Sequence, residues 1–102
     1  MARRPMAPTP PLEGLALMLD GYFHEDFRAE HGSHEAAARA FVRDASQEEV
    51  TEARVALEAF INWADGVPRE AWQEALLRAV GSWQPRTLAP LREVSAILAA
   101  PG

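Results

Sequence analysis

The sequence predicts an all-α protein, a compact bundle of about five helices. Three observations favour this fold class. Apolar residues recur at spacings of three and four in five segments, and no segment alternates polar and apolar residues as a half-buried strand does. Short connections separate the segments, which places consecutive helices antiparallel. The chain has 102 residues, 48% of them hydrophobic and 25% charged, which is typical of one soluble domain.

The first helix is expected to begin after Pro10 and Pro11, because proline suits the first turn of a helix. On a helical wheel of 100° per residue, Leu17 and Met18 fall on the back of this helix. There they either pack under another helix or form an exposed patch. The apolar stripe on the front comprises Leu12, Leu15, Leu19, Tyr22, Phe23 and Phe27.

Capping residues delimit the second and third helices. Ser33 follows a glycine and is placed to cap a helix from His34 to about Asp44. Ser46 and Glu49 have the spacing of a capping box, which opens the third and longest helix. That helix is expected to end at residues 65–68, where the sequence is Asp-Gly-Val-Pro. Its inward residues are Val50, Ala53, Leu57, Phe60, Ile61 and Ala64.

Two shorter helices complete the predicted bundle. The fourth runs from Pro68 to about Val80 with Trp72 on its apolar face, so Trp72 is expected in the core. The fifth spans about residues 88–99, with a proline in its first turn, where proline is tolerated. Trp63 falls beside the inward face of the third helix, so either core or partner contact is open for it.

Residues 20–27 combine three aromatic side chains, one histidine and three carboxylates, in the order Asp-Gly-Tyr-Phe-His-Glu-Asp-Phe. With the leucine-containing helix before them, they resemble the opening of a family of small bacterial immunity proteins from contact-dependent growth inhibition systems. Ala40-Phe41-Val42-Arg43-Asp44 and the segment Val55 to Ile61 fall at matching places, so the resemblance covers roughly residues 12–79. It implies a protein that binds and neutralises a cognate toxin domain and performs no catalysis.

The helical wheel divides this motif into structural and partner-facing side chains. Phe23 and Phe27 lie on the apolar stripe and are expected to be core residues. Asp26 falls inside the stripe, where a carboxylate needs a backbone N–H or an arginine as its partner. The candidates for contacting a toxin lie beside the stripe or at its edge, except Glu25, which faces away from it, and Glu30, which follows the motif; they are Asp20, Tyr22, His24, Glu25 and Glu30.

Acidic residues concentrate in the same part of the chain. Residues 12–35 hold six acidic residues and one arginine, a charge of −5, and the whole chain also sums to −5. An acidic surface repels phosphate, so nucleic acid is not an expected partner, whereas a basic protein is. The absence of cysteine fits a reducing cytoplasm. No apolar run approaches a membrane span, so a membrane is not an expected partner either.

The sequence also bounds the domain and the alternatives. Residues 1–11 contain four prolines and are expected to be a flexible leader, while residues 12–100 form a single helical domain.

One alternative function is a generic helical interaction module with an unrelated partner, which a toxin gene next to this one would argue against.

The other alternative is a small metal-dependent enzyme. Glu30 and His34 are spaced as ligands on one helix turn, but Gly32 and Ser33 interrupt any helix between them. The sequence shows no recognisable nucleophile and no oxyanion-hole motif near the histidines. We therefore expect no metal, no cofactor and no catalytic residue, which metal analysis of the purified protein tests. The potential ligands considered are His24, Glu25, Asp26, Glu30, His31 and His34.

Overall fold

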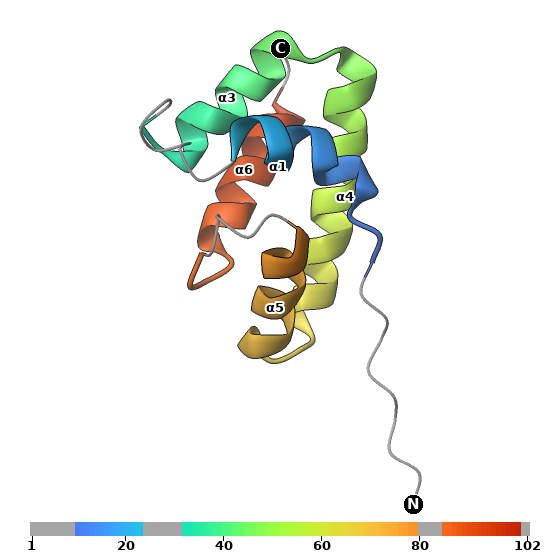
Figure 1. Ribbon diagram of the computed structural model, residues 1–102, viewed down its shortest axis with the longest axis vertical. Coiled ribbons are helices and arrows are strands. Elements are labelled where there is room, and N and C mark those ends of the chain that lie inside the picture. Colours follow the sequence, from blue (N-terminus) through green and yellow to red (C-terminus); the bar gives the residue numbers. More distant parts are fainter. Residues whose placement is uncertain (1–9, 24–31, 80–84, 101–102) are drawn as a thin grey trace, which may run out of the picture.

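The computed structural model describes residues 10–23, 32–79 and 85–100 (Figure 1). These residues form five α-helices and one short 3-10 turn, with no strand among them, so the predicted all-α bundle is confirmed. The elements in chain order are η1 (Glu13–Leu15), α1 (Ala16–Tyr22), α3 (His34–Asp44), α4 (Gln47–Asp65), α5 (Arg69–Ala79) and α6 (Ala89–Ala99).

Helix α4 is the longest element, and most of the others are arranged around it (Figure 1). Along α4 pack α6 and η1, and α5 contacts it after the turn that follows Asp65. Helix α3 lies against α6 and α1 rather than mainly against its sequence neighbour α4. The described helices include none that is both long and apolar enough to cross a membrane.

Side-chain caps fix the starts of α3 and α4 as the sequence predicts. The Ser33 hydroxyl accepts a hydrogen bond from the Ala36 N–H at 3.1 Å. At α4 both bonds of the capping box form, because Ser46 Oγ accepts from the Glu49 N–H at 3.1 Å and Glu49 Oε1 accepts from the Ser46 N–H at 2.8 Å. These bonds satisfy N–H groups that have no partner inside the helix.

The prediction of one continuous first helix is wrong. The segment begins as the 3-10 turn η1, and α1 ends at Tyr22 because Phe23 has non-helical dihedral angles (φ −122°, ψ 23°). Gly14 in η1 approaches α4 closely: a Cβ there would lie 3.0 Å from the Glu52 carbonyl oxygen and 3.1 Å from Ala56 Cβ. Glycine therefore permits the packing of this turn against α4.

The tighter turn also decides which back-face residue enters the core. A 3-10 helix rotates about 120° per residue instead of 100°, so three residues of it turn α1 by about 60° relative to Leu12. Met18 is consequently fully buried, at 0% exposure, whereas Leu17 stays 51% exposed. The two possibilities predicted for this pair were burial under another helix and exposure at the surface. Met18 is buried and Leu17 is exposed.

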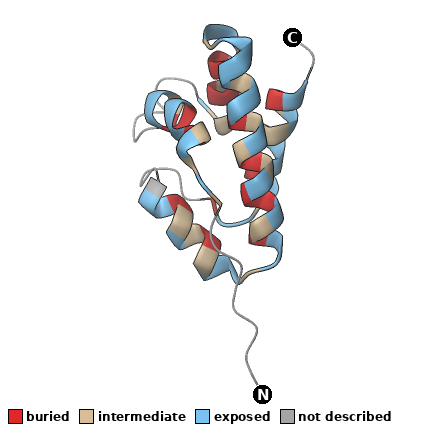
Figure 2. Cartoon of the chain, turned by 90° about the vertical axis from the view of Figure 1, so that its right-hand side faces the viewer, coloured by how far each residue is buried: buried red, intermediate tan, exposed pale blue. Residues whose placement is uncertain are grey.

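Buried residues are interleaved with exposed ones along the helices, as amphipathic helices require (Figure 2). Trp72 lies in the core as predicted, while Trp63 is half-buried with its ring 5.7 Å from that of Phe60. No polar or charged residue is buried in the described part of the chain. The core joins η1, α1, α3, α4, α5 and α6 through Leu15, Met18, Leu19, Phe23, Ala37, Ala38, Phe41, Ala53, Leu57, Phe60, Ile61, Ala64, Trp72, Leu76, Leu91, Val94 and Leu98.

Candidate functional site

The aromatic motif is tied to the end of α3 through Tyr22. The Tyr22 hydroxyl donates a hydrogen bond to Asp44 Oδ2 at 3.0 Å, and its ring meets Phe41 edge-on with centroids 5.6 Å apart. Arg43 holds the same carboxylate through bonds of 2.9 and 3.2 Å. Burial, followed by the bond to Asp44, raises the pKa of Tyr22. Tyr22 is thus a fixed, neutral donor that orients an acidic group.

Four exposed carboxylates gather where α3 passes into α4, and we name them the acidic corner: Asp44, Glu48, Glu49 and Glu52. Acidic residues in the first turn of α4 are stabilised by the positive end of the helix dipole. The charge of Glu49 also contributes to the raised pKa of Tyr22, which places the motif beside this corner. A surface hollow of about 470 Å³ opens there, lined by Gln47, Glu48, Thr51 and Glu52.

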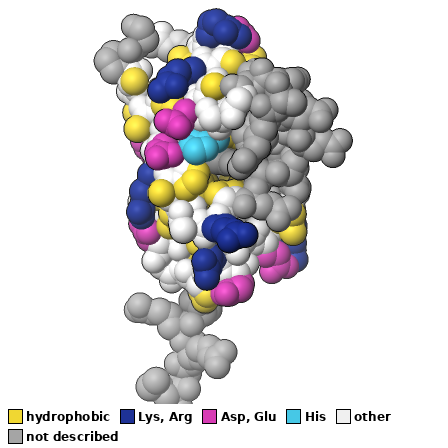
Figure 3. All heavy atoms as spheres, turned by 90° about the vertical axis from the view of Figure 1, so that its left-hand side faces the viewer, with side chains coloured by type: hydrophobic (Ala, Val, Ile, Leu, Met, Phe, Trp, Pro, Cys, Tyr) yellow, Lys and Arg dark blue, Asp and Glu magenta, His cyan; other side chains and the backbone are white. Residues whose placement is uncertain are grey.

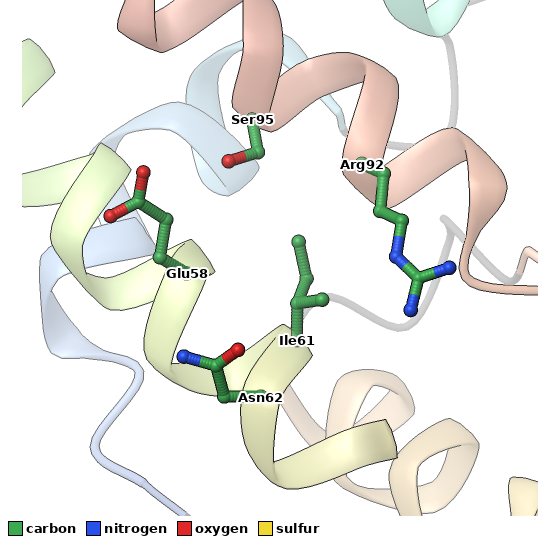
Figure 4. A pocket seen from close by; sticks show the side chains of 5 residues that line it. All are labelled: Glu58, Ile61, Asn62, Arg92 and Ser95. Carbon is green, nitrogen blue, oxygen red and sulfur yellow. The ribbon is translucent and has the colours of Figure 1, made fainter.

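A second hollow, of about 300 Å³, forms a groove between α4 and α6. Its lining residues from α4 are Glu58, Ile61 and Asn62, and α6 supplies Arg92 and Ser95 (Figure 4). Ile61 lies between the two charged side chains, with Glu58 on one side and Arg92 on the other (Figure 4). Arg92 donates to Asp65 Oδ1 at 2.6 Å, while Arg54 reaches Glu58 only at 3.3 and 3.4 Å.

A third cluster joins α3 to α6 on another face. His34 is the one histidine in the described ranges, and Figure 3 shows it in cyan at the surface with acidic side chains beside it. One ligand atom each from His34, Glu35 and Glu93 lies within 4.8 Å of the others, a combination that can hold a divalent cation. His34 Nε2 already lies 2.6 Å from Glu93 Oε1, so a hydrogen bond between two helices also satisfies the cluster.

The structure places the sequence-predicted residues unequally. Asp20 is exposed on α1, Tyr22 is half-buried against Asp44, and Phe23 is fully buried, as expected for a core residue. The remaining residues of the motif and Glu30 after it lie outside the described part of the chain, so their predicted roles stay predictions; they are His24, Glu25, Asp26, Phe27 and Glu30.

Sequence reasoning missed the outer face of α4, and one signal was present. Val55 falls outside the inward register of that helix, and it is 54% exposed. An apolar residue off the core stripe marks a face that is not wholly polar. Four residues that line the two hollows lie on the same side of the helix. Glu48 and Thr51 line the hollow at the acidic corner, and Glu58 and Asn62 line the groove.

Comparison with known protein families gives a match for this chain. The family described as CdiI immunity protein matches residues 11–82, well over half of the chain. The chain belongs to this family. It is therefore an immunity protein of a contact-dependent growth inhibition system, which neutralises a toxin and has a toxin protein as its partner. No curated protein and no solved structure matches it.

The match to the CdiI family covers the part of the chain in which the motif lies. The matched residues run from η1 through α5 and include Tyr22, the acidic corner and the α4 wall of the groove. Helix α6, which supplies Arg92 and Ser95, lies beyond the match. The role of an immunity protein is inhibition by binding, and exposed surfaces rather than a catalytic centre are what that role requires.

Proposed function

We propose that this CdiI immunity protein neutralises its toxin by covering a basic site on the toxin domain with the acidic corner and the adjoining motif. The observation that carries the proposal is the group of four exposed carboxylates, of which Glu48 and Glu52 line a hollow, within the residues that the family match covers. Complementary charge steers association and fixes orientation more than it adds affinity. The corner therefore captures the toxin, and closer contacts hold it.

Tyr22 supports this role by holding one carboxylate in place. Its ring is fixed against Phe41, and its hydroxyl bonds Asp44, so the acceptor is oriented before the partner arrives. A group that is ordered in the free protein loses less conformational entropy on binding. The proposed toxin contacts are the acidic corner and the residues expected from the sequence. The latter are Asp20, Tyr22, His24, Glu25 and Glu30.

The proposal specifies a binding protein without chemistry of its own. It acts in the cytoplasm and uses no metal, cofactor or catalytic residue. Neither nucleic acid nor membrane is a partner, since the carboxylates of the corner repel phosphate groups.

The test begins with copurification from the native host and mass spectrometry of the bound protein, which identifies the toxin domain. Stopped-flow association is then measured over a salt series. Reversal of two acidic residues, Asp20→Lys with Glu52→Lys, should slow association and weaken its dependence on salt, because steering by exposed charges is screened.

A matched control changes net charge equally at a different place. Glu70→Lys with Glu74→Lys reverses two exposed acids on α5, away from the corner. This control should slow association much less than the first pair. Equal slowing by both pairs would mean that only net charge matters, and an unchanged rate in both would remove the corner from the interface.

A further inference from the structure

We infer that the groove between α4 and α6 receives one arginine side chain of the toxin domain. The inference rests on the proposed function, because it names a second contact for the same partner. The groove is walled by Glu58 and Asn62 on α4 and by Ser95 on α6, over an apolar floor at Ile61 (Figure 4).

The polar groups of the groove are available to a ligand. Within the part of the chain that the structure describes, the side chains of Asn62 and Ser95 make no hydrogen bond. The Glu58 carboxylate is held only at 3.3 and 3.4 Å by Arg54, which is at the long limit of a hydrogen bond. The groove thus presents three oxygen acceptors without strong partners.

The two charges of the groove differ in how far they are already neutralised. Arg92 donates to Asp65 at 2.6 Å, a short charge-assisted bond. Glu58 has no bond of comparable quality. The charge of Glu58 is therefore the less fully neutralised of the two. The groove favours a ligand that donates hydrogen bonds over one that accepts them.

Arginine fits this combination better than lysine or an apolar residue. Its planar guanidinium carries five N–H donors, which suits several acceptors at once, and its aliphatic stem packs on an apolar floor. A volume of about 300 Å³ accommodates a single long side chain. Arginine is also among the residues that most often dominate binding energy at interfaces.

The groove and the acidic corner lie on one surface. Glu48, Val55 and Glu58 fall on the same outward side of α4 at 100° per residue. Glu58 follows Glu48 by ten positions, about 15 Å along the helix, which one protein interface of ordinary size covers. Exposed Val55 lies between the two hollows and supplies an apolar contact.

The experiment measures dissociation of the toxin domain identified by copurification. Glu58→Gln keeps the size of the side chain and removes its charge, and it should speed dissociation about tenfold or more if a buried arginine is lost. Asn62→Arg fills the groove with a like charge and should do the same. Leu77→Arg, an equivalent change at an exposed position on α5, should leave dissociation unaltered.

Further variants separate this inference from its alternatives. Glu58→Leu should weaken binding as Glu58→Gln does; unchanged or tighter binding would mean an apolar occupant and would overturn the assignment of arginine. Thermal unfolding by circular dichroism verifies that each variant is folded. A toxin that binds all variants like the natural protein would exclude the groove but leave toxin neutralisation standing. A toxin domain that does not bind the natural protein would overturn both.

Discussion

The Tyr22 hydroxyl donates to Asp44 at 3.0 Å and so joins the last residue of α1 to the last residue of α3. Burial and this bond raise the pKa of Tyr22 above its ordinary value of 10.0. The chain has one tyrosine, and its sequence contains neither lysine nor cysteine. Tyr22 is therefore the side chain expected to dominate titration above pH 10.

The first prediction is that Tyr22 ionises above pH 10 in the folded protein and that stability falls in the same range. Since the pKa is raised on folding, the folded state binds the proton more tightly than the unfolded state. The stabilisation is complete below the unfolded pKa and is lost as pH rises through the folded one. Ultraviolet absorbance of tyrosinate and urea unfolding at several pH values measure the two effects.

Asp44→Asn is the matched variant for this titration. It keeps an acceptor at the same place but removes the negative charge that opposes ionisation of Tyr22, so the pKa should move back toward its ordinary value. An unchanged titration in this variant would contradict the assignment of Asp44 as a cause.

The second prediction compares two adjacent residues of α1. Met18→Ala should cost about 2–5 kcal/mol of unfolding free energy, because it leaves a cavity in the core. Leu17→Ala should change that free energy by less than about 0.5 kcal/mol, because Leu17 is half exposed. Urea titrations of both variants measure the difference, and equal losses would show that the phase of α1 is wrong.

The third prediction concerns the capping box of α4. Ser46→Ala removes the acceptor for the Glu49 N–H and should cost about 1 kcal/mol. Thr51→Ala, an exposed change inside the same helix, should leave stability equal or slightly raised because alanine is the better helix former. Thermal denaturation followed by circular dichroism compares them. If Thr51→Ala lost as much stability as Ser46→Ala, the loss could not be assigned to the capping bond.

The fourth prediction is that the protein does not depend on a metal. His34 pairs with Glu93 at 2.6 Å, so the cluster with Glu35 has an internal partner for its histidine. Chelation with EDTA should leave the melting temperature unchanged, and added zinc should not raise it. A rise with zinc that disappears in His34→Gln would show that the three residues bind the ion.

Local signals in the sequence predicted most of the helices. Ser33 and Ser46 were identified as caps because a serine hydroxyl bonds N–H groups two or three residues ahead, and this depends only on the nearby chain. The buried position of Trp72 also followed from helical spacing alone.

The same reasoning failed at the first helix. A 3-10 turn forms where Gly14 lets the backbone approach Glu52 and Ala56, and those residues are about forty positions away in the sequence. The wheel therefore did not predict that Met18, rather than Leu17, enters the core.

The sequence by itself determined the helical class, the helix caps and the immunity family, because capping, periodicity and motifs are written in neighbouring residues. Only the tertiary structure decided which distant side chains come together: Tyr22 bonds Asp44, His34 bonds Glu93, and Glu58 and Ser95 line one groove. The physical reason is that these pairs depend on how helices pack, and packing angles and offsets are set by the whole core rather than by any one segment.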